Sequence, residues 1–241
     1  MNELIKVLLI IPAYNEEKNL THLVECINSY RSKEVLMKYQ LDYIIINDGS
    51  TDCTAELCKR NNYNVINLVH NLGIGGAVQT GYKYAFMNNY DIAVQFDGDG
   101  QYDINSLGNL IDPIIEGDCN FTVGSRFINE KSTFNSTFFR RIGIKWLSLL
   151  LKIFGCNVKD VTSGYRAADK MVISYFTKYY PSDYPEPEVL VALKKRGYHI
   201  KELPVNMFER RNGHSSITYV KSVYYMIKVS LAILYAGFQK K

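Results

Sequence analysis

The chain has 241 residues, of which 47% are hydrophobic and 22% are charged, a balance that is typical of globular proteins and excludes disordered and fibrous classes. Its formal charge of +4 is too small to indicate a nucleic-acid-binding protein, so no nucleic-acid partner is expected. A chain of this length can bury a sizeable core, either as one large α/β domain or as two small domains.

The cysteines and the apolar runs indicate a compartment. The five cysteines are odd in number and include no C-x-x-C pair, so we expect reduced thiols in a cytosolic environment rather than disulfides or a zinc site. The apolar run from Val7 to Ile11 is too short for a signal peptide. No segment approaches the roughly 18 to 20 apolar residues that cross a bilayer. We therefore expect a protein that is not integral to a membrane.

The first half of the chain alternates short apolar runs with segments of helical spacing. Strands are predicted at Ile5–Ile11, Tyr43–Ile46, Asn64–Val69 and Ile92–Phe96, and helices at Glu16–Tyr30, Ala55–Arg60 and Gly75–Met87. This alternation predicts an α/β fold with a mostly parallel sheet and helices on both faces. In the less regular second half, strands are predicted at Phe121–Gly124 and Lys201–Val205, and no linker is evident. We expect one domain with a C-terminal helical extension.

Polar loops follow three of the predicted strands, at residues 12–16, 47–52 and 97–101. Ligands of open α/β sheets bind beyond the carboxyl ends of the strands, so we expect these loops to converge. Asp97 and Asp99 point the same way in an extended segment and repel each other unless a cation is present. Carboxylate oxygens suit Mg²⁺ or Mn²⁺, which bridges substrate phosphates. An exposed acidic turn is the alternative, because Asp-Gly is a common turn pair.

Glycines and arginines supply further candidates for phosphate binding. The glycine-rich segment 71–76 precedes a helix, where it either cradles a phosphate or makes a tight strand-to-helix connection. Arg126, Arg166 and Arg210 lie near glycine and serine in loops. Such arginines are suited to bidentate phosphate contacts, and solvated surface arginines are the alternative. The histidines are scattered, so covalent catalysis is not predicted.

Seven segments occur in the order and spacing of a known family. The segments Ile11–Glu17, Asn47–Asp52, His70–Ala77 and Asp97–Gln101 resemble the family-2 glycosyltransferases, which have the GT-A fold. Three later segments are similar to the dolichol-phosphate mannosyltransferase and polyprenyl-phosphate glycosyltransferase branch: Gly124–Arg126, Asp160–Arg166 and Arg210–Ser215. On this resemblance, residues 1–216 form the catalytic domain and residues 217–241 an apolar and basic helix near the membrane.

The resemblance implies a role for particular residues. It implies that the nucleotide sugar is bound by Pro12, Tyr14, Glu16, Asp48, Asp97 and Gly98. It implies that a divalent metal, Mg²⁺ or Mn²⁺, is held by Asp97, Asp99 and Gln101. It implies that donor and acceptor phosphates are bound by Arg126, Arg210 and Ser215, and that the sugar and acceptor site is lined by Asp160 and Arg166. The expected catalytic residues are accordingly Asp99, Asp160, Arg126 and Arg166.

The family reaction inverts the anomeric centre by direct displacement. A phosphate acceptor is already anionic and needs no strong general base, so the metal and the arginines would act by stabilising the leaving nucleoside diphosphate. Two departures from the family pattern concern Gly98, where alanine is common, and His214, where glutamate is usual. Glu186 and Glu188 lie in a proline-rich segment that either contacts the sugar or acceptor or braces the start of a helix.

Two segments suggest contact with a membrane. In Phe138–Phe154, a narrow polar stripe is formed by Arg141, Lys145, Ser148 and Lys152, and nearly all other residues are large and apolar. A basic amphipathic helix of this kind is typical of a membrane interface, and a core helix with its stripe in water is the alternative. Val229–Phe238 is too short to span a bilayer but long enough to lie on one. We expect a peripheral enzyme on the inner, cytoplasmic face of the membrane, held by the bilayer or by an integral-membrane partner.

The leading hypothesis is transfer of a sugar from a GDP- or UDP-sugar to a polyprenyl phosphate, dolichyl or undecaprenyl. A second hypothesis keeps this donor site but extends a lipid-linked glycan in cell-surface polysaccharide synthesis. A non-catalytic subunit that binds nucleotide sugars would have lost its carboxylates, whereas Asp97, Asp99 and Asp160 are present. A sugar nucleotidyltransferase would open with a G-x-G-T-R-like loop, where Pro12–Glu16 stands instead.

Overall fold

The computed structural model of the protein describes residues 4–32, 38–128, 138–208 and 219–238. Its centre is a seven-stranded sheet with the strand order β3-β2-β1-β4-β6-β5-β7. The strands are β1 (Ile5–Ala13), β2 (Tyr39–Asn47), β3 (Val65–Asn67), β4 (Ile92–Gln95), β5 (Phe121–Ser125), β6 (Arg166–Asp169) and β7 (Ile200–Pro204). Strand β6 is antiparallel to its neighbours β4 and β5, and the other paired strands are parallel. The predicted α/β class with a mostly parallel sheet is confirmed.

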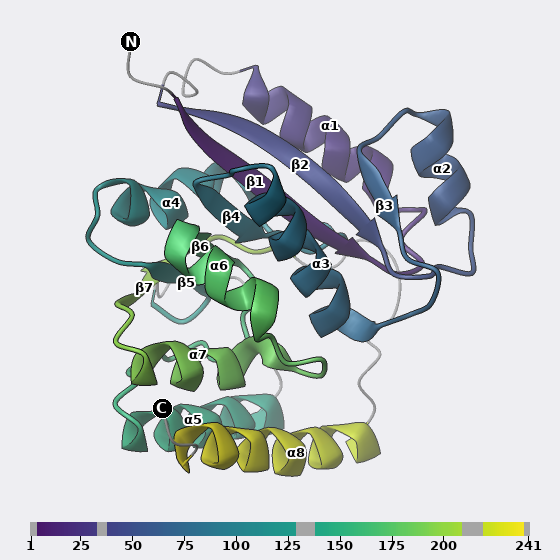
Figure 1. The fold of residues 1–241 in the computed structure, drawn as a ribbon. Helices are drawn as coiled ribbons and strands as arrows, with labels where there is room; N and C mark the ends of the chain where they lie inside the picture. The colour runs from purple at the N-terminus through teal and green to yellow at the C-terminus, as the bar shows by residue number, and fades with distance from the viewer. Residues whose placement is uncertain (1–3, 33–37, 129–137, 209–218, 239–241) are drawn as a thin grey trace.

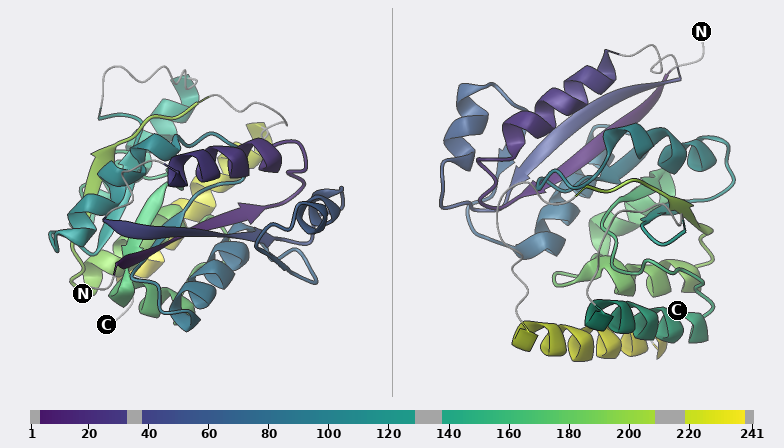
Figure 2. Two further views of the ribbon diagram at one scale, coloured as in Figure 1. Left: turned by 90° about the horizontal axis from the view of Figure 1, so that it is seen from above. Right: turned by 180° about the vertical axis from the view of Figure 1, so that it is seen from behind.

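Helices cover both faces of the sheet (Figures 1 and 2). They are α1 (Leu20–Arg31), α2 (Thr54–Arg60), α3 (Gly73–Met87), α4 (Leu107–Ile115), α5 (Phe138–Ile153), α6 (Lys170–Lys178), α7 (Pro185–Lys195) and α8 (Tyr219–Phe238). Helices α1, α2 and α4 share one hydrophobic core with the sheet, whereas α3 and α6 form the other core. Helices α5, α7 and α8 extend this second core away from the sheet.

Strand β1 is central because its side chains are buried on both faces. Leu8 and Ile10 face the α3 side, whereas the alternate residues Val7 and Leu9 face the α1 side. A continuous apolar run of this kind is typical of a strand covered by helices on both faces. A Cβ added at Gly81 of α3 would lie 2.2 Å from Cγ2 of Ile10, so only glycine lets the helix approach the strand this closely.

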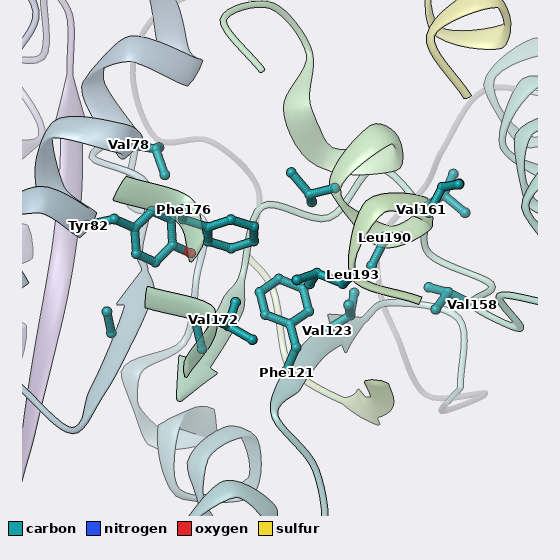
Figure 3. Packing of buried hydrophobic residues seen from close by; sticks show 14 of the residues in the cluster. Val78, Tyr82, Phe121, Val123, Val158, Val161, Val172, Phe176, Leu190 and Leu193 are labelled. Carbon is teal, nitrogen blue, oxygen red and sulfur yellow. The ribbon is translucent and has the colours of Figure 1, made fainter. Parts of the chain in front are cut away.

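Aromatic side chains join α6 to the sheet and to α3. Figure 3 shows Tyr82 beside Phe176, with ring centroids 4.8 Å apart. Phe121 of β5 meets Phe176 edge-on at 5.9 Å. Leu190 and Leu193 bring α7 onto the same core. These contacts fix α6 and α7, and they thereby fix the connection between them, which borders the candidate site.

The sequence patterns do not predict β6, α4 or α6. Strand β6 contains two alanines and no β-branched residue, so it lacks the usual strand signal. Helix α4 contains Pro113, and proline disfavours a helix interior. Some predicted ends are also wrong: β1 continues through Pro12 to Ala13, β2 begins at Tyr39, and α1 begins at Leu20.

Helices α5 and α8 lie side by side in a layer beyond α7 (Figures 1 and 2). Trp146 Nε1 donates a hydrogen bond to Ser230 Oγ at 3.1 Å, and the rings of Phe154 and Phe238 meet edge-on at 5.6 Å. Lys195 of α7 donates hydrogen bonds to the last carbonyl groups of α8. Among the helices in the described residues, none has the length and apolar character needed to cross a membrane.

Candidate functional site

The loops that follow β1, β2 and β4 meet at the carboxyl edge of the sheet. The backbone N–H of Asp48 donates to the carbonyl of Ala13 at 2.9 Å. The N–H of Gly98 donates to the carbonyl of Pro12 at 3.3 Å, and a Cβ at Gly98 would lie 3.0 Å from that same oxygen. The predicted convergence of the three loops is therefore confirmed.

Of the residues predicted to bind the nucleotide, Pro12 lies near the end of β1 and the others lie in these loops. The side chain of Tyr14 is 47% exposed at the edge. Glu16 accepts a hydrogen bond from Asn19 Nδ2 at 2.5 Å. Asp48 is buried, and its Oδ1 accepts from the backbone N–H of Leu72 at 2.7 Å. Asp48 thus ties the loop after β2 to the glycine-rich segment before α3. Contacts of these residues with a nucleotide remain predictions.

The glycine-rich segment before α3 is shaped by close packing. Gly73 has a φ of +76°, which favours glycine. Gly75 donates its N–H to the carbonyl of Ser182 at 3.1 Å, and a Cβ at Gly75 would lie 2.1 Å from the carbonyl oxygen of Pro181. The chain between α6 and α7 therefore presses on the start of α3. Of the two interpretations of this segment, these contacts favour the tight connection.

Asp97 and Asp99 follow β4 at the same edge, and both are half-buried. Tyr102 Oη donates to Asp97 Oδ2 at 2.7 Å, and Gln95 Nε2 donates to Asp97 Oδ1 at 3.0 Å. The N–H of Gln101 donates to Asp99 Oδ1 at 3.1 Å. Burial and the charge of Asp97 raise the pKa of Tyr102 well above its ordinary value, so its hydroxyl stays a donor. Neighbouring groups thus orient both carboxylates, and we call the end of the sheet at Asp97 and Asp99 the acidic edge.

This set of oxygen ligands fits a divalent metal. Mg²⁺ is commonly bound through one or two carboxylates together with substrate phosphates and water, and Mn²⁺ accepts the same ligands. The residues of this chain that would hold the ion are Asp97, Asp99 and Gln101. The described residues contain no group of three or more His, Cys, Asp or Glu side chains that could hold a metal.

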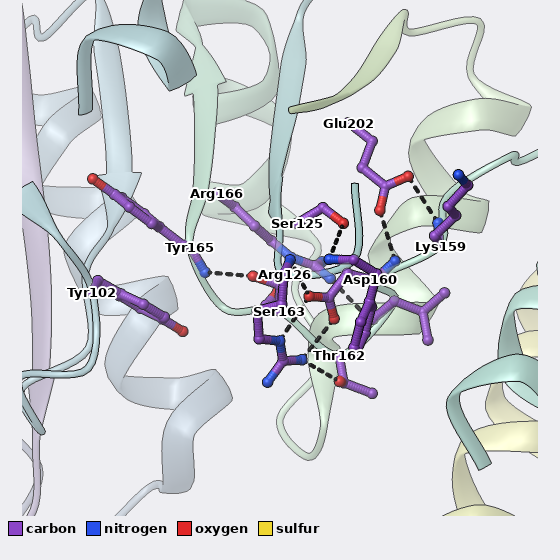
Figure 4. A network of polar contacts seen from close by, with 12 residues as sticks. Tyr102, Ser125, Arg126, Lys159, Asp160, Thr162, Ser163, Tyr165, Arg166 and Glu202 are labelled. Atoms are coloured by element: carbon purple, nitrogen blue, oxygen red, sulfur yellow. Dashed lines mark hydrogen bonds and ion pairs between the residues drawn. The ribbon is translucent and has the colours of Figure 1, made fainter. Parts of the chain in front are cut away.

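Arg126 and Asp160 form a buried ion pair (Figure 4). Arg126 Nε donates to Asp160 Oδ2 at 2.7 Å, and Nη2 donates to Asp160 Oδ1 at 2.6 Å and to Thr162 Oγ1 at 3.0 Å. Burial alone would lower the pKa of Arg126, but the hydrogen bonds and charge of Asp160 outweigh it and raise the pKa. The pair locks the end of β5 to the loop before β6. Its contacts with sugar or phosphate remain predictions.

Arg166 is almost fully buried, and its guanidinium donates hydrogen bonds to backbone carbonyl groups. Nε donates to the carbonyl of Ser163 at 2.6 Å, and Nη2 to the carbonyl of Val161 at 3.0 Å. Nη1 donates to the carbonyl of Glu186 at 2.5 Å. Arg166 therefore joins the loop before β6 to the first turn of α7. This is a positioning role, and a direct contact with substrate remains a prediction.

The prolines of the segment 185–188 begin α7, as the braced-helix interpretation predicts. Glu186 is half-buried; burial raises the pKa of its carboxyl, Arg166 opposes the rise, and Asp97 adds to it. Burial also raises the pKa of Glu188, which lines a separate cavity of about 550 Å³ between α6 and α7. The charges of Arg166 and Asp97 thus reach Glu186, whereas Glu188 faces a separate cavity.

The two remaining predicted phosphate ligands, Arg210 and Ser215, lie outside the described residues, as does His214. The segment that leads to them, after β7, passes beside the loop that contains Asp97 and Asp99. The N–H of Phe208 donates to the carbonyl of Gln101 at 2.8 Å.

Sequence reasoning missed several residues that support the site: Gln95, Tyr102, Thr162 and Glu202. The Glu202 carboxylate accepts hydrogen bonds from the backbone N–H groups of Lys159 at 2.9 Å and Asp160 at 2.7 Å. A glutamine at the end of an apolar strand is a usable signal for Gln95. Glu202 carries no such local signal, because its partner lies 42 residues away in the chain.

Comparisons with known proteins identify relatives along most of the chain. The profile of glycosyl transferase family 2 matches residues 8–176. The chain is 33% identical over 217 residues to the UDP-N-acetylglucosamine–dolichyl-phosphate N-acetylglucosaminyltransferase of Methanococcus voltae, covering 82% of this chain and 83% of the relative. It is 26% identical over 223 residues to the undecaprenyl-phosphate mannosyltransferase of Micrococcus luteus, covering 88% of each.

The fold is also similar to a solved structure, glucosyl-3-phosphoglycerate synthase from Mycobacterium tuberculosis in complex with Mn²⁺, UDP-glucose and phosphoglyceric acid. The TM-score is 0.70 at 17% sequence identity, covering 100% of this chain and 82% of that one. At this identity the similarity concerns the fold, and it confirms the expected GT-A architecture. With the family profile and these relatives together, the chain belongs to the family-2 glycosyltransferases and is a glycosyltransferase enzyme.

Proposed function

We propose that the enzyme transfers a sugar from a GDP- or UDP-sugar to a polyprenyl phosphate, dolichyl or undecaprenyl. One observation carries the proposal: the carboxylates of Asp97 and Asp99 stand, oriented by their neighbours, at the edge where the strand-end loops meet. Relatives of the chain are named for transfer of sugars to dolichyl and undecaprenyl phosphates. A paired carboxylate site supports a diphosphate-linked donor, because two carboxylates and a diphosphate together complete a divalent-metal site.

On the donor side, the base and ribose contact the end of β1 through Pro12, and the loops after β1 and β2 through Tyr14, Glu16 and Asp48. The diphosphate lies at Asp97, Gly98 and Asp99. When bound there, a divalent metal neutralises the charge that develops on the leaving diphosphate. Asp48 keeps the glycine-rich segment beside this edge through its hydrogen bond to Leu72.

On the acceptor side, the phosphate oxygen attacks the anomeric carbon directly and inverts it. The attacking oxygen is already anionic, so no strong base is required. Both carboxylate oxygens of Asp160 accept hydrogen bonds from Arg126, so the chain itself engages this carboxylate, and we assign it no role as a base. We assign phosphate binding to Arg126, Arg210 and Ser215, and we assign to Asp160 and Arg166 the shaping of the sugar and acceptor walls.

A lipid acceptor fits the layer formed by α5 and α8. The inner side of α5 is buried through residues such as Leu147 and Leu151. The outward side chains of both helices are large, apolar and exposed, and we call them the outer apolar surface: Trp146, Leu149, Ile153, Tyr224, Ile227, Leu231, Tyr235 and Phe238. Exposed lysines at 145 and 152 border it on α5. Apolar helix faces with tryptophan and basic neighbours are suited to a membrane interface.

We therefore propose a peripheral enzyme whose outer apolar surface rests on the cytoplasmic face of a membrane. The N-terminal end of α8 lies on the side of the molecule toward which β1 and β2 run (Figure 1). Lys228 of α8 pairs with Asp183, and Tyr225 packs edge-on against Tyr184 at 4.7 Å. These contacts hold the membrane-facing layer close to the first turn of α7 and hence to the acidic edge. All five cysteines are free, which suits a reducing compartment.

The direct test incubates the enzyme with Mn²⁺, a panel of GDP- and UDP-sugars and a short-chain polyprenyl phosphate. Mass spectrometry should find one polyprenyl-phosphate sugar. If no donor gives this product while lipid-linked oligosaccharides are elongated, the acceptor assignment is wrong.

A separate sedimentation assay with anionic liposomes tests the proposal that the enzyme binds a membrane surface. Protein that stays in the supernatant at low salt would contradict it.

A further inference from the structure

Three groups close around the carboxylate of Asp97. Tyr102 Oη holds one oxygen at 2.7 Å, and Gln95 Nε2 holds the other at 3.0 Å. The backbone of Gly164 forms the third side. A Cβ added at Gly164 would lie 2.7 Å from Tyr102 Oη, 2.8 Å from Gln95 Nε2 and 2.9 Å from Asp97 Oδ2. A side chain at this position would displace the two donors or the carboxylate, so the glycine lets the loop before β6 lie directly against them.

The ring of Tyr102 is itself held in place. It stacks on the ring of Tyr165 with centroids 4.8 Å apart and an interplanar angle of 12°. It meets the ring of Phe96 edge-on at 5.8 Å. The backbone of Tyr102 also bridges to Met207. Figure 4 shows Tyr102 and Tyr165 lying side by side. The direction of the hydroxyl is therefore set by packing around the whole ring.

The buried side chain of Gln95 lowers the stability of the fold. Its side chain is 1% exposed, and its Oε1 has no hydrogen-bond partner in the described part of the chain. An unpartnered buried carbonyl is unfavourable, so stability alone would favour an apolar residue at this position. What the glutamine provides in return is the hydrogen bond from Nε2 to Asp97. Buried groups that cost stability are characteristic of functional sites.

We infer that Tyr102 is a positioning residue which, together with Gln95, fixes the plane of the Asp97 carboxylate for the divalent metal. Tyr102 and Gln95 donate to different oxygens of Asp97, and two donors on different oxygens fix the plane of a carboxylate, each oxygen of which has two lone pairs. Hydrogen bonds to a metal-ligating carboxylate set its direction and the affinity of the metal. The inference rests on the metal site of the proposed function and adds to it the residues that set its affinity.

The test compares Tyr102→Phe with Tyr165→Phe. Each change removes one hydroxyl from the same stacked pair, but only Tyr102 contacts Asp97; the Tyr165 hydroxyl donates to the carbonyl of Asp103 at 3.3 Å. The affinity for Mn²⁺ is obtained from the concentration of free Mn²⁺, which electron paramagnetic resonance measures. UDP or GDP is present, and no turnover takes place. We expect Tyr102→Phe to weaken Mn²⁺ binding about 10-fold or more, and Tyr165→Phe to leave it within about twofold of wild type.

In turnover, Tyr102→Phe should raise the Mn²⁺ concentration for half-maximal rate by a similar factor. At saturating Mn²⁺ its kcat should return to within about threefold of wild type. A merely structural role would instead lower the rate at all metal concentrations and leave the affinity for Mn²⁺ unchanged.

Gln95→Leu is the second variant, and it decides the question if Tyr102→Phe does not fold. It removes the hydrogen bond to Asp97 and the unpartnered Oε1 together. We expect the melting temperature to stay level or rise while Mn²⁺ binding weakens several-fold. Wild-type Mn²⁺ affinity in every folded variant of this pair would overturn the inference. Because binding is measured without turnover, this outcome is distinct from failure of the proposed function, in which wild-type enzyme forms no glycolipid from any donor.

Discussion

Two sets of predicted site residues, one from each half of the chain, differ in burial. In the N-terminal half, Tyr14, Asp97 and Asp99 stand at the carboxyl edge of parallel strands with part of each side chain exposed. In the C-terminal half, Arg126, Asp160 and Arg166 are buried, and their charged groups bind one another or backbone carbonyls. The first set is therefore open to the ligand of the proposed site, whereas the charged groups of the second set hold segments of the chain together.

This contrast predicts different consequences for equivalent mutations. Removing the half-buried carboxylate of Asp99 should abolish activity with little effect on folding. Removing the buried, paired carboxylate of Asp160 should destabilise the protein. The predictions that follow test this difference, beginning with the largest expected effect.

Asp99→Ala should reduce turnover by at least about 10²- to 10³-fold, because it removes a ligand of the metal that stabilises the leaving diphosphate. Its melting temperature should stay close to that of wild type, since Asp99 is half-buried beside a second carboxylate. Steady-state rates at saturating Mn²⁺ and calorimetry measure the two effects. Wild-type turnover in this variant would remove the claim that the acidic edge carries the reaction.

Asp160→Ala should destabilise the fold by about 3–5 kcal/mol, because Arg126 would remain as a buried charge without its carboxylate partner. Chemical denaturation measures the change. Asp118→Ala provides the control, since it breaks the exposed pair with Lys201 and should change stability far less than Asp160→Ala does. Equal losses in the two variants would show that the buried pair has no special structural role.

Leu231→Glu should weaken binding to anionic liposomes by about tenfold or more, since it places a charge in the middle of the outer apolar surface. Leu231 is exposed, so folding should be unaffected. Met171→Glu is the matched control, because Met171 is similarly exposed but lies on α6, outside that surface. If both variants bind liposomes equally, α8 does not face the membrane.

Glu186→Gln should have the smallest effect, on the pH dependence of stability. Burial, partly opposed by Arg166 and reinforced by Asp97, raises the pKa of this carboxyl above its ordinary value of 4.5, so the folded chain holds the proton more tightly than the unfolded chain. This contribution is present at low pH and is lost as pH rises through the folded pKa. The variant should therefore melt slightly higher than wild type at pH 7, and the difference should shrink toward pH 4. A difference that is constant with pH would contradict this assignment.

The sequence was informative where function depends on neighbouring residues in the chain. A buried apolar strand followed directly by a polar loop predicts both the strand and the edge at which the loop lies, so the places of Pro12, Asp48, Asp97 and Asp99 could be predicted. The antiparallel strand β6 could not, because its alanines give no periodic signal and its pairing depends on β4 and β5.

The network behind the site was also beyond sequence reasoning. Arg126 pairs with Asp160, which lies 34 residues away in the sequence. The residues next to an arginine do not show whether it is buried in an ion pair or binds a phosphate. The same holds for Gly164, whose missing side chain makes room for Tyr102 and Gln95. Such residues are determined by packing between distant segments, so only the three-dimensional arrangement reveals them.

The central claim is that the anionic oxygen of a lipid phosphate attacks the donor sugar without help from a general base. The most direct measurement compares a polyprenyl phosphate with the corresponding polyprenyl alcohol as acceptor, with the preferred nucleotide sugar and Mn²⁺. The account predicts Mn²⁺-dependent product with inverted anomeric configuration from the phosphate and none from the alcohol. Transfer to both acceptors at similar rates, or product of retained configuration, would contradict it.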